Sequence, residues 1–126
     1  MANKPVLTLK DILKRKEFFE KKSQETMELE IRELNANIVI SKPDKELCVD
    51  CLEMEDAADG DRYLVYEIVK EPNLKDPELQ KEFGCVSPID IVDVIFSPGT
   101  VAGIAKEGMR FAGYFDGVKV VEDLKN

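Results

Sequence analysis

Apolar residues recur at helical spacing near the start of the chain. The segment 9–21 has one apolar face, formed by Leu9, Ile12, Leu13 and Phe19. This spacing predicts an amphipathic helix, with Thr8 as its N-cap and Asp11 placed for a capping box. The opposite face is basic and carries Lys14, Arg15, Lys21 and Lys22. We expect the basic face to be solvated or to lie against the acidic remainder of the domain; a membrane surface or an acidic partner is the alternative.

A period of two replaces the helical period after this segment. Between Met27 and Arg32, apolar residues alternate with charged ones, which predicts a half-buried strand. Turn-forming residues follow at Asn35–Asn37, and Ile38–Ile40 supplies a return strand. The pair predicts an antiparallel hairpin, and its apolar face must pack on helices because a two-stranded hairpin is not stable alone.

From Asp44 onward the apolar positions return to a helical period. An acidic loop at 55–60 separates the first two predicted helices, and residues such as Asp76-Pro77 mark the later starts. We predict helices at 44–54, 61–70, 77–83, 88–96 and 98–113. An irregular tail over 115–126 follows, with a short strand at Val118–Val121.

These elements predict an α+β fold over residues 1–126. We expect a single domain, mostly helical with about five helices, that carries an N-terminal antiparallel β-hairpin. A chain of 126 residues is long enough for one modest core.

The charge of the chain is acidic and unevenly distributed. Its net charge is −8, and the segment 44–61 alone has eight acids and one lysine. Nucleic-acid binding requires clustered Lys and Arg, so it is disfavoured. The longest apolar runs are far shorter than the roughly 20 residues of a membrane span, and no apolar stretch typical of a secretory signal is present. We therefore expect a cytosolic protein that does not bind membranes.

The residue types of the chain argue against an enzyme. It contains no histidine, which excludes Ser-His-Asp and Cys-His catalysis and histidine-ligated metals. The one candidate motif is the CxxC pair of Cys48 and Cys51, which would suit a redox dithiol or half a zinc site. Both cysteines lie within a predicted helix among acids, so we interpret them as buried structural residues. We expect no cofactor and no metal.

Two other patterns in the sequence concern binding sites. The acids around Gly60 do not have the spacing of a calcium-binding loop, so we predict a solvated acidic loop. The glycines of the last helix do not form a phosphate-binding motif; they are Gly99, Gly103, Gly108 and Gly113. They predict close helix–helix packing, either within the fold or between copies in a homo-oligomer.

Several segments in the second half resemble a known family. They include Tyr63–Tyr66, Glu71–Asp76, Pro88–Asp93 and Pro98-Gly99, and through them the chain resembles the XkdN-like tail assembly chaperones of tailed phages and phage-derived elements. The residue after Pro98-Gly99, where the family carries an acid, is Thr100. The family also lacks a CxxC pair.

The resemblance implies a non-enzymatic helper of tail assembly. Such chaperones bind the long, helical tape measure protein, keep it soluble and help to recruit tail tube protein. They act in the cytoplasm of the bacterial host and are absent from the mature virion. The alternatives are a structural tail component, such as a tail completion protein, and a CxxC oxidoreductase.

The expected mode of action is binding of a client helix in a groove. Our candidate contact residues are Val101, Ile104 and Met109 on the last helix. The second candidate is Leu74, in the turn at Pro72–Lys75, which we expect to be exposed.

Overall fold

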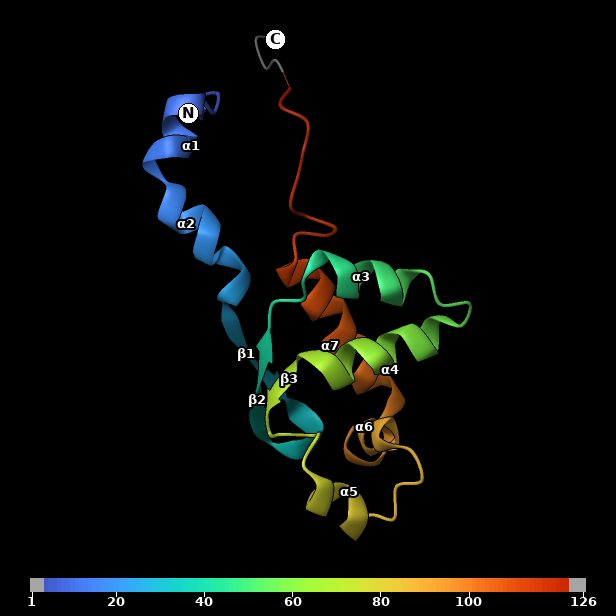
Figure 1. The fold of residues 1–126 in the computed structure, drawn as a ribbon. Helices are drawn as coiled ribbons and strands as arrows, with labels where there is room; N and C mark the ends of the chain where they lie inside the picture. Colours follow the sequence, from blue (N-terminus) through green and yellow to red (C-terminus); the bar gives the residue numbers. More distant parts are fainter. Residues whose placement is uncertain (1–3, 123–126) are drawn as a thin grey trace.

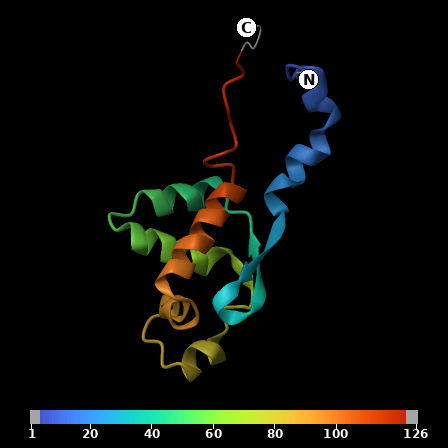
Figure 2. The ribbon, with the colours of Figure 1, turned by 180° about the vertical axis from the view of Figure 1, so that it is seen from behind.

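The fold consists of a helical layer packed on a small sheet, with a helical arm outside both. A computed structural model describes residues 4–122. Figures 1 and 2 show helices α3 (Lys45–Leu52) and α4 (Ala57–Ile68) side by side, with α7 (Pro98–Phe111) crossing them and the three-stranded sheet at one end of this group. The predicted α+β fold, mostly helical with an N-terminal hairpin, is confirmed, and the described residues form seven α-helices.

The arm consists of residues 4–24 and contains α1 (Leu9–Lys14), α2 (Lys16–Lys21) and the short 3₁₀ helix η1 (Lys22–Gln24). The predicted capping box forms, because the Thr8 side chain accepts from the Asp11 amide and the Asp11 carboxylate accepts from the Thr8 amide, both at 3.1 Å. The single predicted helix over 9–21 is wrong, since it is interrupted at Arg15. Neither α1 nor α2 contains a buried residue, so no packing holds the segment as one continuous helix.

The hairpin forms where the alternation predicts it. Strand β1 (Thr26–Ile31) leads through the 3₁₀ helix η2 (Arg32–Leu34) to β2 (Ala36–Ser41). The two strands are antiparallel, with Leu29 opposite Ile38. Their apolar residues therefore share the face that packs on the helices.

The next elements contain two corrections. Helix α3 (Lys45–Leu52) forms as predicted, but α4 (Ala57–Ile68) begins inside the predicted acidic loop. It does so because the Asp56 side chain caps it, accepting from the Ala58 amide at 2.8 Å. The helix ends two residues early because Val69–Glu71 forms strand β3, which pairs antiparallel with β2.

The remaining helices start at the predicted proline positions. They are α5 (Pro77–Glu82), the 3₁₀ helix η3 (Pro88–Asp90) with α6 (Ile91–Ile95), and α7 (Pro98–Phe111). After α7 the described residues up to Glu122 are irregular. The predicted strand at Val118–Val121 is wrong, because no neighbouring strand pairs with it there.

Helix α4 lies at the centre of the core. Its residues Leu64, Val65 and Ile68 are almost completely buried, together with residues of the sheet, α3, α6 and α7. Two glycines allow the close packing. A Cβ at Gly60 would lie 2.6 Å from the Cys51 carbonyl oxygen of α3, and one at Gly108 would lie 2.6 Å from Cδ1 of Ile68.

Substituting alanine at two glycines tests this packing. Gly60→Ala should lower the free energy of unfolding by about 1–3 kcal/mol, because the backbone of α3 must move. Gly103→Ala, on the open side of α7 with nothing within 4 Å, should raise it by roughly 0.5–1 kcal/mol through helix propensity. Urea unfolding of both variants measures the difference; equal effects of the two changes would contradict the packing of α3 on α4.

Candidate partner-binding surfaces

The four residues predicted to contact a partner lie in the core. Val101, Ile104 and Met109 face inward from α7, and Leu74 is 0% exposed. All four belong to the same buried cluster. The expectation that they form an exposed contact surface is therefore wrong: their side chains already stabilise the monomer.

The turn containing Leu74 is held in place by its neighbours. The Gln80 side-chain amide donates to the Leu74 carbonyl oxygen at 2.9 Å, and Lys75 forms an ion pair with Glu67 at 2.9 Å. These contacts fix the turn against α4 and α5 and direct Leu74 into the core. The turn itself is exposed at Pro72, Asn73 and Lys75, as predicted, and only Leu74 points inward. Its polar neighbours in the sequence do not reveal this burial.

Exposed apolar side chains are instead numerous on the arm, and others lie on the tail after α7. Figures 1 and 2 show the arm extending away from the domain. Leu9 is 80% exposed and Leu13 is 74% exposed, although both belong to the apolar face predicted for this segment. The other exposed apolar residues of the arm are Val6, Leu7, Ile12 and Phe18. An exposed apolar patch of this kind is typical of an interaction site.

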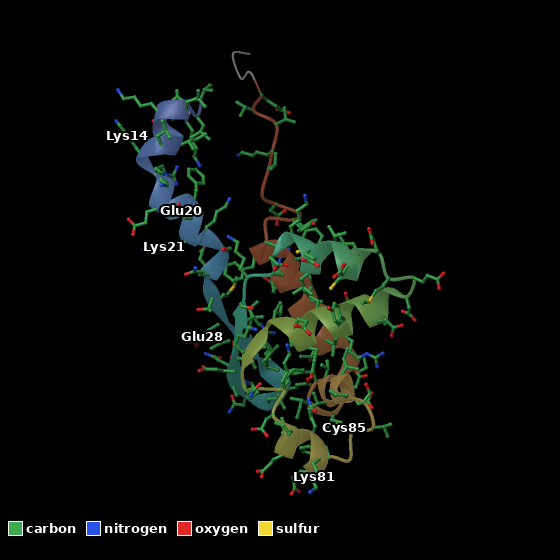
Figure 3. The ribbon with its side chains drawn as sticks, viewed as in Figure 1. Lys14, Glu20, Lys21, Glu28, Lys81 and Cys85 are labelled. Atoms are coloured by element: carbon green, nitrogen blue, oxygen red, sulfur yellow. The ribbon has the colours of Figure 1, made fainter. Side chains whose placement is uncertain are left out.

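The arm and the rest of the described chain differ in charge. Residues 4–24 contain seven Lys/Arg and three Asp/Glu, a net +4, whereas residues 25–122 contain ten and twenty-two, a net −12. Figure 3 shows Lys14 and Lys21 at the surface of the arm. The arm therefore combines apolar side chains with positive charge, which favours a partner with apolar and acidic residues.

A second surface feature is a groove of about 510 Å³ between β1 and α7. Leu29–Glu33 form one wall, and α7 forms the other with Thr100, Gly103, Ile104 and Glu107. The groove is acidic, because its lining contains three glutamates (Glu30, Glu33 and Glu107) and one cation, Arg32.

Glu33, which lines the groove, also binds the start of α7. The amide of Ser97 donates to the Glu33 carboxylate at 3.0 Å, and the Ser97 hydroxyl donates to it as well. The hydroxyl and then the amide of Ser97 hold the pKa of Glu33 below its usual range. An acid from η2 thus supplies the negative charge that favours a helix N-terminus, next to Thr100.

The two cysteines of the CxxC pair are buried between α3 and its neighbours. Burial, and then the charge of Cys48 and Asp50, raises the pKa of the Cys51 thiol to about 11. Burial and Asp44 raise the pKa of Cys48 as well. A reactive thiol requires a lowered pKa and access to solvent, so the arrangement favours the structural role predicted for both residues.

Residues 4–122 contain neither a clustered metal site nor a single membrane-spanning helix. No group of three or more Cys, Asp or Glu residues in this range is arranged to hold a metal ion. No single helix there is long and apolar enough to cross a membrane. A pair formed by Pro88–Ile95 and Pro98–Phe111 has the length and composition for a span, but it is bent by 108° and contributes buried residues to the core.

Comparison of the chain with protein-family models, with curated proteins and with solved structures gave no match.

Thiol labelling tests the placement of the cysteines. In the folded protein, Cys85 should react with a disulfide reagent at mildly alkaline pH, because it is partly exposed outside α3 (Figure 3). Cys48 and Cys51 should react only after unfolding in urea, because they are buried with raised pKa values. Peptide mass mapping identifies the labelled sites; rapid labelling of Cys48 or Cys51 in the folded chain would contradict a structural role.

Proposed function

We propose that this protein is a tail assembly chaperone that binds a tape measure protein and assists the assembly of the tail tube. The observation that carries the proposal is the apolar arm, whose Leu9 and Leu13 are almost fully exposed. The resemblance of Tyr63–Tyr66 and Glu71–Asp76 to XkdN-like chaperones supports it and supplies the identity of the client.

The arm suits a long helical client because both expose apolar side chains to water. A tape measure protein presents apolar stripes along its helices, and these stripes aggregate unless another apolar surface covers them. The exposed leucines of the arm provide such a surface. Each leucine removed from water contributes about 1.5–3 kcal/mol, so a few side chains are enough for reversible binding.

The structure of the arm also fits a temporary contact. Helices α1 and α2 have six residues each, and isolated helices this short are marginally stable in water. Client binding would extend and stabilise them, at a cost in ordering that limits the affinity. A chaperone that must later release its client needs such a limited affinity.

This mode of binding replaces the one predicted from the sequence. The client does not lie on Val101, Ile104 and Met109, because these residues form the core. The chaperone instead supplies an amphipathic helix of its own, and the basic residues beside Leu9 and Leu13 favour client helices with acidic flanks.

Substitutions in the arm test the proposal. The protein should keep its tape measure protein soluble when the two are co-expressed, and the complex should co-purify. Leu9→Ser combined with Leu13→Ser should weaken binding by roughly 100-fold or more and return the client to the insoluble fraction. The free energy of unfolding should not change, because neither side chain packs on the domain.

A matched control is available on the body of the domain. Val86 is 98% exposed but lies outside the arm, so Val86→Ser should bind the client as the wild type does. Failure of the wild-type chain to rescue or bind the client would refute the proposal. Detection of the chain in purified virions by mass spectrometry would favour a structural tail component instead.

A further inference from the structure

One edge of the sheet has no partner among the described residues. The strand order is β1-β2-β3, and β1 pairs only with β2. Its residues Leu29–Ile31 line the groove whose other wall is α7. An exposed edge strand presents unpaired backbone N–H and C=O groups, and proteins commonly use such an edge to bind an extended segment.

The side chains of β1 disfavour pairing with the β1 of another copy. Glu28 and Glu30 are exposed on one face of the strand, and Figure 3 shows Glu28 pointing outward. Antiparallel pairing of two β1 strands on matching faces would place glutamates opposite or next to one another, which is unfavourable. The edge therefore selects a different segment, one with a cation on the face that carries the glutamates.

The end of the described chain contains a segment with the matching pattern. Val118 and Val120 are 88% and 85% exposed, Lys119 lies between them, and Val121 follows at 81%. Valine strongly favours strands, yet these residues form no strand in the single chain. In a strand, Val118 and Val120 would share one face and Lys119 would take the other.

The two patterns are complementary over Val118–Val120, and Val121 falls on the same face as Lys119. With Lys119 opposite Glu30, the two valines lie opposite Leu29 and Ile31 on the apolar face. A strand in this position lies over the groove beside Gly103, where a Cβ atom would meet nothing within 4 Å.

We infer that Val118–Val121 of one copy adds to β1 of a second copy as a fourth strand. The tail does not pair with β1 of its own chain: Figures 1 and 2 show that it leaves the end of α7 and runs away from the sheet. Reciprocal exchange of two tails closes a dimer. This inference does not rest on the proposed function and concerns residues outside the arm.

Sedimentation velocity over low-micromolar to millimolar concentrations tests the exchange. The wild-type chain should associate reversibly, with two copies in the complex. Lys119→Glu should raise the dissociation constant by roughly tenfold or more, because it replaces an attraction to Glu30 with a repulsion. Lys81→Glu makes the same change in charge on α5, far from β1 (Figure 3), and should leave association unchanged.

Charge reversal and filling of the groove give independent checks. Glu30→Lys should weaken association as Lys119→Glu does, and the two changes together should restore it. Gly103→Leu should block the groove without destabilising α7, whereas Gly99→Leu, also in open space but outside the groove, should not affect association.

Two results would overturn the inference. The first is a wild-type chain that stays monomeric over the whole range, which includes the case of a tail folded onto its own β1. The second is association that survives Lys119→Glu and Gly103→Leu unchanged. Neither result bears on client binding by the arm, which the leucine variants test separately.

Discussion

The fold depends on the burial of α4 between the other elements of the domain. Leu64, Val65 and Ile68 meet α7 on one side and lie with the sheet and α3 in the same core. Helix α4 also continues directly into β3, so the chain passes from the helical layer to the sheet without a loop. Because α4 is joined to the sheet through β3 and packs on α7, the sheet and the helical layer are held in a fixed position relative to each other.

This arrangement explains why the two ends of the described chain lie outside the body. The arm enters at the start of β1, and the tail leaves at the end of α7; both extend beyond the same end of the domain (Figure 1). With the core filled by side chains from the body, the apolar residues of the arm and tail have no place within it. Short helices and single strands are marginally stable in water on their own, which fits the proposals that both segments bind surfaces of other chains.

The parts of the fold that depend on local chemistry could be predicted from the sequence. The Thr8 capping box, the antiparallel hairpin, and the helix starts at Pro77 and Pro98 all follow from patterns within short segments. Strand β3 is not predicted, because a three-residue strand directly after an apolar helix is too short for its period of two to be distinguished from the helical period. The predicted start of α4 is four residues too late, because the acids and the glycine of segment 55–60 are typical of a loop and the N-cap at Asp56 is the only signal for an earlier start.

The candidate surfaces could not be predicted in the same way. An amphipathic pattern states that one face of a helix avoids water but does not state which surface covers that face. The pattern at Leu9 and Leu13 is therefore the same for a helix packed on its own core and for one whose apolar face is covered only when another chain binds. The reverse holds for Leu74 and Val101, where only the tertiary packing reveals that the side chains are already covered.

The most direct test of this account is hydrogen exchange measured by mass spectrometry on the chain alone and with its client. The account predicts rapid exchange of the amides in α1 and α2 in the dilute free chain, slow exchange in α4, and protection of the arm when the client is bound. An arm already protected in the free chain, or a bound client that protects the body and leaves the arm unchanged, would contradict it.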